Sequence, residues 1–365
     1  MCSRVWKKTM SKDSFIENAA GGQTDDIENT IKDENPGHVF NDSFEDMADV
    51  LKASESILIF PHINGDGDAI GSSAALCKAL RKLNKSAYVL LEDKIPDNLK
   101  FMDKEYFTED FSAILNPDVC ICVDCGETKR FPKRKRKFAG GKTTICIDHH
   151  GTSTGFCDYN HIDPGSAATG QLIYKLILAM GVELDKEMGE AIFAAITTDT
   201  GNFQYSNTSK ETHEIVAKLY EAGIDANAVS VELYERVSLK KINLEADILS
   251  RIRIYADGKL ALGYVSEEML RKHGAALEDA EGVVARLRSI DGVEIAAFVK
   301  EHGEESCRVS LRAKRVGDVS EIAEAFGGGG HVKAAGCTIH MNLEETIKAI
   351  KAKALESLAS CKDGI

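Results

Sequence analysis

The sequence has no long apolar run, few aromatic residues (7%) and no excess of positive charge. No stretch approaches the ~20 consecutive apolar residues that span a bilayer, and the basic start of the chain, residues 1–8, is not followed by the apolar segment of a secretory signal. The formal net charge of −13 argues against a protein that coats long nucleic acid, because a sequence-independent grip on phosphates needs a basic face. We therefore expect a cytoplasmic protein with no membrane contact and no long duplex DNA as partner. A small anionic substrate in a locally positive or metal-filled cleft is compatible with this charge.

Cysteine occurs ten times, but the cysteines are scattered along the chain. Cys120, Cys122 and Cys146 lie inside apolar segments, where a free thiol behaves as a small hydrophobic group. Because the chain shows no secretory signal, we expect reduced thiols rather than disulfides. The alternative, a zinc or iron–sulfur site at Cys120, Cys122 and Cys125, lacks a convincing fourth ligand.

A chain of 365 residues that is 43% hydrophobic and 28% charged is globular in composition and too long for one ordinary core. Residues 1–40 are polar and aperiodic, so we expect a disordered tail. Between residues 41 and 240, apolar strands alternate with helical segments, which predicts a parallel α/β sheet with helices on both faces. Residues 241–252 are expected to be a linker, and residues 253–365 a smaller α/β domain.

Apolar periodicity locates the individual elements. In the first domain we expect strands at 56–60, 87–91, 118–123 and 143–147, and helices at 41–55, 69–83, 166–180, 185–198, 209–222 and 225–236. In the second we expect strands at 259–265, 293–299 and 306–313, helices at 280–288, 318–326 and 342–360, and a glycine-rich loop before the last helix.

Ionisable side chains follow three of the predicted strands and end one of the helices. Because the carboxyl ends of parallel strands meet at one edge of a sheet, where open α/β sheets bind ligands, we expect these side chains to converge. Each alone could be a turn former or a helix cap, but the coincidence of all four is hard to explain by capping. The residues are His62, Asp66, Asp68, Asp124, Asp148, His149, His150 and Asp199.

This set of ligands suits divalent metal ions. Carboxylates with one imidazole per site favour an octahedral ion, Mn²⁺ first and then Mg²⁺ or Co²⁺. Six protein ligands are too many for one catalytic ion with open positions, but they suit two ions that share a carboxylate. Two such ions, ~3.5–4 Å apart, can activate a bridging water and stabilise charge on a phosphoryl group. The sequence therefore predicts phosphoester hydrolysis.

The strings H-x-x-x-D-x-D-x-x-G-S, a lone strand-end aspartate, D-H-H and T-D-T-G follow one another over residues 55–240. In this order they resemble the DHH phosphoesterase superfamily. The resemblance implies that one metal is held by His62, Asp66 and Asp124. It implies that a second is held by Asp68, Asp124, His149 and Asp199, so that Asp124 bridges the two.

The same resemblance assigns roles to the other two residues of the D-H-H string. It implies that Asp148 orients its neighbours without binding a metal. It also implies that His150 faces the scissile phosphate as a hydrogen-bond donor or acid.

The segments V-S-L-R at 309–312 and G-G-G-G-H-V-K-A-A-G at 327–336 resemble the DHHA1 domain. The backbone N–H groups of a glycine run can cradle an anion, and an arginine can grip a phosphate bidentately. A flexible hinge is the alternative for the glycine run. The candidate substrate-binding residues are Arg312, Gly328, Gly329, Gly330 and His331.

Together the two domains resemble the oligoribonuclease and 3′,5′-bisphosphate nucleotidase proteins (nanoRNases). The resemblance implies short oligonucleotides or adenosine 3′,5′-bisphosphate (pAp) as substrates, an active site between the domains, and compatibility with a homodimer. Gly65 stands where the family commonly has Pro, and Ala313 where it commonly has Ser, so the preferred substrate stays open. The alternatives are a linear or cyclic dinucleotide (di-AMP type) phosphodiesterase, a DHH-type pyrophosphatase, a processive single-strand exonuclease, and a nucleotide-binding regulator without catalysis.

A basic run, residues 129–137, places seven cations in nine residues shortly after Asp124. A solvated basic surface is one interpretation. A ridge that tracks phosphates at the mouth of the cleft is the other, and it predicts salt-sensitive binding of longer oligonucleotides.

Overall fold

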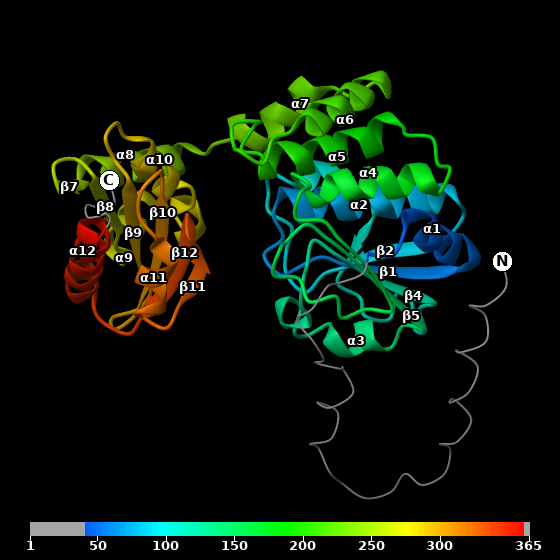
Figure 1. Ribbon diagram of the computed structural model, residues 1–365, viewed down its shortest axis with the longest axis horizontal. Coiled ribbons are helices and arrows are strands. Elements are labelled where there is room, and N and C mark those ends of the chain that lie inside the picture. The colour runs from blue at the N-terminus through cyan, green and yellow to red at the C-terminus, as the bar shows by residue number, and fades with distance from the viewer. Residues whose placement is uncertain (1–40, 361–365) are drawn as a thin grey trace, which may run out of the picture. The chain divides into compact units, whose positions relative to one another are not determined.

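The computed structural model describes residues 41–360, so the tail expected at 1–40 lies outside the described residues. The chain divides into two compact units between Glu235 and Arg236, each built around its own six-stranded sheet (Figure 1).

The first unit contains a fully parallel sheet in the order β3-β2-β1-β4-β5-β6. Its central strands coincide with the four predicted ones, while the short edge strands β3 and β6 were not predicted. The strands are β1 Ser56–Phe60, β2 Ser86–Leu90, β3 Phe107–Thr108, β4 Val119–Val123, β5 Thr143–Asp148 and β6 Tyr159–Ile162.

Helices cover both faces of this sheet, as expected for an α/β fold (Figure 1). Along β1, Ile57 and Ile59 pack into the larger core against α1, α2, α4 and α5, whereas Leu58 and Phe60 face a smaller core beside α3. Burial on both faces explains why this strand is a continuous apolar run. The helices are α1 Phe44–Ala53, α2 Gly67–Lys82, α3 Lys135–Ala139, α4 Thr169–Ala179, α5 Lys186–Asp199, α6 Lys210–Glu221 and α7 Ala226–Ser230, followed by a π-helical turn at Val231–Glu235.

Helices α2 and α5 approach each other closely because glycines lie at their contact. A Cβ atom on Gly71 would meet the Ala191 carbonyl oxygen at 2.4 Å, and one on Gly67 would meet Thr198 Oγ1 at the same distance. This contact brings the end of α5, with Asp199, next to the start of α2, with Asp68.

The second unit contains a mixed sheet in the order β11-β12-β10-β9-β8-β7, in which only β8 and β9 pair in parallel. One face packs on α11 and α12, and the other packs on α8, α9 and α10 over part of its width. Part of the expected glycine-rich loop is the short strand β11. The strands are β7 Arg253–Tyr255, β8 Leu260–Val265, β9 Ile295–Glu301, β10 Cys307–Ala313, β11 Gly329–His331 and β12 Ala334–Ile339. The helices are α8 Leu239–Ser250, α9 Glu267–His273, α10 Val283–Ser289, α11 Val319–Glu324 and α12 Leu343–Ser360.

Residues 241–252, expected to be a linker, lie mostly within α8. Leu244 and Ile248 of this helix are fully buried in the core of the second unit, because they recur at helical spacing and face Ala261 and Val265 of β8. Within residues 41–360, no helix combines the length and the apolar character needed to cross a membrane.

Candidate metal centre

The predicted ligands converge at the carboxyl edge of the first sheet. Strands β1, β4 and β5 are adjacent there, and the strand order reverses at the β1–β4 pair, which is where open α/β sheets bind ligands. Three groups have ligand atoms within 4.8 Å of one another: His62, Asp66 and Asp124; Asp68, His149 and Asp199; and Asp124, His149 and His150.

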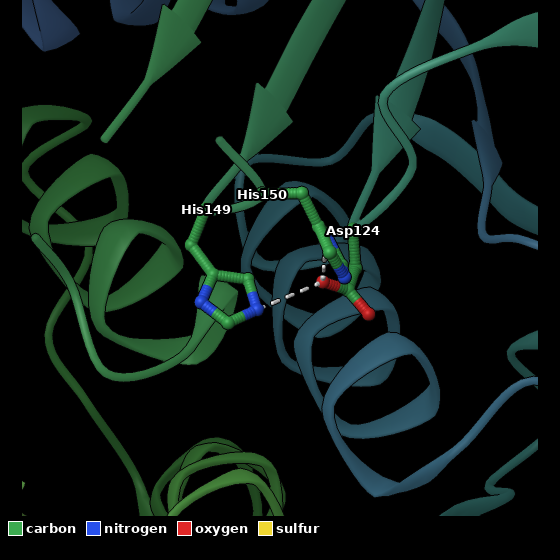
Figure 2. Close-up of side chains that lie close together, drawn as sticks. All are labelled: Asp124, His149 and His150. Carbon is green, nitrogen blue, oxygen red and sulfur yellow. Dashed lines mark ion pairs between the residues drawn. The ribbon is translucent and has the colours of Figure 1, made fainter. Parts of the chain in front are cut away.

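Asp124 stands at the centre of this arrangement. It follows β4 with a left-handed φ of 56°, which aspartate tolerates better than most residues, and it is only 1% exposed. Its Oδ2 lies 3.5 Å from His62 Nε2, while its Oδ1 lies 3.7 Å from His149 Nε2. The two oxygens therefore face two different groups of ligands, as a carboxylate shared by two ions would. Figure 2 shows one of these groups, in which Asp124 Oδ1 faces His149 and His150.

Backbone carbonyls orient His62 and His149. His62 Nδ1 lies 2.7 Å from the Ile63 carbonyl oxygen, and His149 Nδ1 lies 3.2 Å from that of Ser166. A proton on each Nδ1 would donate to these oxygens and leave each Nε2 with a free lone pair, which is the usual arrangement behind a metal-binding imidazole. His149 Nε2 also lies 3.3 Å from Asp199 Oδ2.

Asp66 and Asp68 are held by helix N-termini. Asp66 caps α2, since its Oδ1 accepts hydrogen bonds from the backbone N–H groups of Asp68 and Ala69, and its Oδ2 faces His62 at 3.9 Å. The carboxylate of Asp68 accepts from the backbone N–H groups of Thr169 and Gly170 at the start of α4, at 2.7 and 2.9 Å. Both carboxylates are thus oriented before any ligand binds.

Protein residues alone leave the negative charge of the site poorly compensated. Burial, together with the neighbouring carboxylates, raises the pKa of Asp68 well above its usual range. Burial likewise raises the pKa of Asp199 to about 6, although His149 opposes the shift. For Asp124 burial acts in the same direction, but the hydrogen bond to His62 and the charges of the three histidines outweigh it and lower the pKa to about 2. Divalent cations would relieve this repulsion, so the residues present fit the expected metals.

His150 differs from the other histidines because its nearest partner is Asp148. The distance from His150 Nδ1 to Asp148 Oδ1 is 2.7 Å, against 3.7 Å to Asp124 Oδ1. The Asp148 hydrogen bond raises the pKa of His150 to about 9. Asp148 is fully buried, and its Oδ2 has no hydrogen-bond partner among the described residues. A positively charged His150 could therefore donate a hydrogen bond to an anion.

Several supporting residues were not predicted. Thr169 donates from Oγ1 to Asp124 Oδ1 at 2.8 Å, and Ser72 donates from Oγ to Asp68 Oδ1 at 2.9 Å. Ser72 lies four residues after Asp68, which directly precedes the predicted helix at 69–83, so its spacing was a usable signal. Thr169 is 45 residues from Asp124, and nothing in the sequence links the two.

The predicted substrate-binding residues belong to the second unit. Arg312 lies on β10, and Gly329, Gly330 and His331 form β11, with Gly328 directly before it.

One cation of the basic run is not on the surface. Arg134 is fully buried, and it donates to the Leu90 carbonyl oxygen at 2.6 Å and pairs with Glu92 at 3.3 Å. Both interpretations of the run were wrong for this residue, because its guanidinium is structural.

The described cysteines agree with the expectation of reduced thiols. All eight cysteines that the structure describes are free thiols, including Cys120, Cys122 and Cys125. None of the candidate metal-binding groups within residues 41–360 includes a cysteine.

Comparisons with known proteins agree with the two-unit organisation. Two family models match the chain: the DHH family, N-terminal domain, at residues 56–196, and the DHHA1 domain at residues 257–358. The bifunctional oligoribonuclease and PAP phosphatase NrnA of Thermus thermophilus is 33% identical over 318 residues, which are 86% of this chain and 93% of that protein.

Two solved structures illustrate the similarity of fold. An exopolyphosphatase-related protein from Bacteroides fragilis aligns with a TM-score of 0.83 at 28% identity, over 87% of this chain and 97% of that chain. RecJ from Thermus thermophilus, in complex with Mn²⁺, aligns with a TM-score of 0.52 at 16% identity, over 87% of this chain and 55% of that chain.

Proposed function

Since this chain belongs to the DHH family and carries the DHHA1 domain, we propose that it is a metal-dependent phosphoesterase that hydrolyses short oligonucleotides and the 3′-phosphate of pAp. The observation that carries the proposal is the position of Asp124, whose two carboxylate oxygens face two separate groups of ligands. The similarity to a named oligoribonuclease and PAP phosphatase over most of both chains supports the choice of substrates.

We propose two divalent ions, Mn²⁺ first and Mg²⁺ or Co²⁺ as alternatives. His62, Asp66 and Asp124 would hold one ion; Asp68, Asp124, His149 and Asp199 would hold the other. When bound, such ions supply an activated water nucleophile and neutralise charge on the phosphoryl group.

The protein's own part in the reaction is orientation and proton placement. Thr169 and the α4 N-terminus fix the carboxylates of Asp124 and Asp68, so that the ligands need little rearrangement. Asp148 keeps His150 protonated and directs its Nδ1 inward, which leaves Nε2 as the donor to a phosphate oxygen or to the leaving group.

We assign substrate binding in the second unit to Arg312, Gly328, Gly329, Gly330 and His331. The positive charge of Arg312 suits a terminal phosphate, and the missing side chains of the glycines let a substrate approach the backbone closely. The N–H of Gly328 already donates to the Ala323 carbonyl oxygen. The proposal predicts that changes at Arg312 affect KM more than kcat.

The test uses the full chain with Mn²⁺ and a panel of pAp, pApA, a 5-mer RNA, a 24-mer RNA, cyclic di-AMP and pyrophosphate. We expect turnover of pAp, pApA and the 5-mer, with little on the 24-mer or pyrophosphate. Asp124→Asn should abolish turnover, whereas Asp49→Asn, a matched change at an exposed position of α1, should leave it intact. Turnover of pyrophosphate alone, or of nothing in the panel, would contradict the proposal.

A further inference from the structure

Strands β10 and β12 present a polar, partly exposed face that carries positive charge in addition to Arg312. In β10, Val309 and Leu311 are buried in the core, so the alternation of a strand directs Arg308, Ser310 and Arg312 to the opposite face. Arg308 is exposed, and Ser310 and Arg312 are half-buried.

The strand register places a second cation beside Arg308. Arg308 is paired with Lys300 of β9 on one side and with Thr338 of β12 on the other, so their side chains share this face. Ser310, the next residue on the face, is paired with Gly336. The face thus has a cationic end at Lys300 and Arg308 and a middle made of small residues.

Small side chains leave a hollow beside the cationic end. A pocket of about 700 Å³ is lined by Lys300, Arg308, Ser310, Gly336, Thr338 and His340, and it reaches Gly327 and Gly328 of the glycine run. The pocket therefore connects the proposed phosphate-binding glycines with two further cations.

The charge of this end is only partly neutralised within the unit. Lys300 Nζ lies 3.2 Å from Glu281 Oε1, but that carboxylate is 67% exposed. The Lys300 side chain itself is only 14% exposed, but the exposed Glu281 carboxylate can turn to solvent and leave Lys300 Nζ to a phosphate.

We propose that Lys300 and Arg308 form a second phosphate site, which binds an internal phosphate of an oligonucleotide. The inference rests on the proposed function, because Arg312 and the glycine run are taken to hold the terminal phosphate. Arg308 and Arg312 are four residues apart on one strand, so their Cα atoms are about 13 Å apart. At this spacing two phosphates of a short oligonucleotide can each meet one side chain, whereas a single phosphate would need both side chains to lean toward each other along the strand. The second site makes affinity depend on chain length, so that the 5-mer uses it and pAp does not.

The test measures binding without turnover. Anisotropy of a 3′-labelled RNA 5-mer is recorded with the full chain in EDTA, at several salt concentrations, for the wild type, Arg308→Gln and Lys300→Gln. Loss of a charge-assisted hydrogen bond should weaken 5-mer binding roughly tenfold in each variant and reduce the salt slope by about 1. The affinity of each variant for unlabelled pAp, measured by competition, should be the same as that of the wild type. Lys348→Gln, at an exposed position of α12, is the matched control and should have no effect.

The outcomes separate this inference from the proposed function. A wild type that hydrolyses the 5-mer, together with Arg308→Gln and Lys300→Gln variants of unchanged 5-mer affinity and salt slope, would overturn the second site alone. An equal loss of affinity for pAp and the 5-mer would also overturn it, because the cations would then belong to the terminal-phosphate site. A wild type inactive on the whole panel would overturn the proposed function, whatever the binding data.

Discussion

Thr169 donates a hydrogen bond from Oγ1 to Asp124 Oδ1 at 2.8 Å, across 45 residues of sequence. The same oxygen faces His149, so the hydroxyl fixes the half of the carboxylate that points to the second group of ligands. Thr169 and Asp124 are both buried, and water cannot replace this contact without rearrangement of the surrounding residues.

Removal of the Thr169 hydroxyl should therefore impair the metal centre without unfolding the protein. We expect Thr169→Val to lower Mn²⁺ affinity or activity 10–100-fold, as is typical for a residue that orients a metal ligand. Mn²⁺ titration by calorimetry, together with kcat on pAp, measures the effect. Thr169→Ser keeps the hydroxyl, so it should retain most of the Mn²⁺ affinity and most of the kcat of the wild type. A Thr169→Val variant with wild-type affinity and kcat would show that the hydrogen bond is dispensable.

Gly126 determines how closely the chain passes Asp148. A Cβ atom at residue 126 would lie 2.9 Å from Asp148 Oδ2 and 2.8 Å from Ser153 Cα. Gly126→Ala should destabilise the first unit by about 1–3 kcal/mol, as overpacking does, and should reduce kcat by displacing Asp148 and with it His150. Gly151→Ala is the control, because its Cβ would have no neighbour closer than 3.8 Å. Equal melting temperatures and kcat for the two variants would contradict this interpretation.

Arg134 should affect stability, unlike the other cations of its segment. Arg134→Met leaves Glu92, whose side chain is 5% exposed, without its buried partner, and such a loss typically costs about 3–5 kcal/mol. Lys135→Met, one residue later and exposed, should change the free energy of unfolding by less than about 0.5 kcal/mol. Urea unfolding followed by circular dichroism compares the two variants. Comparable stability would mean that the Arg134–Glu92 pair contributes little.

The stability of the second unit should depend on pH through Asp247. Hydrogen bonds from Lys272, His273 and Arg251 hold the pKa of Asp247 well below its usual range. The pKa of Asp247 in the folded protein lies below its unfolded value of ~3.9. The charged carboxylate therefore stabilises the fold fully at a pH above the unfolded pKa, and this stabilisation is lost as the pH falls toward the folded pKa. Solvent screening limits it to roughly 0.5–1 kcal/mol.

Thermal unfolding of the wild type and Asp247→Asn at pH 7 and pH 2.5 measures this contribution. The variant should be less stable at pH 7, and the difference should shrink at pH 2.5. A difference that is equal at the two pH values would mean that the Asp247 charge is not its source.

The parts of the fold that the sequence predicted are those in which burial imposes a pattern. Strands β1, β4 and β5 are buried on both faces, so they read as uninterrupted apolar runs. Strand β6 was missed because Tyr159–Ile162 has polar residues at an edge, and strand β3 because two residues carry no periodicity. The glycine run was expected to be a loop, but its pairing with β12 depends on a tertiary neighbour.

The converging side chains were recognisable because charged groups follow apolar strands at one sheet edge. Their supporting partners were not, since Thr169 and Ser166 lie beside a helix start, where such residues usually serve as caps. The carbonyl that orients His149 belongs to the backbone and could be any residue type. The sequence therefore indicated which side chains converge at this edge, but not the residues that fix their geometry.

The central claim is that Asp124 is shared by two metal ions, and Mn²⁺ stoichiometry tests it most directly. Equilibrium dialysis with elemental analysis should find two Mn²⁺ per chain in the wild type and at most one in Asp124→Asn, with Asp49→Asn still binding two. One Mn²⁺ per wild-type chain, or two in Asp124→Asn, would contradict the claim.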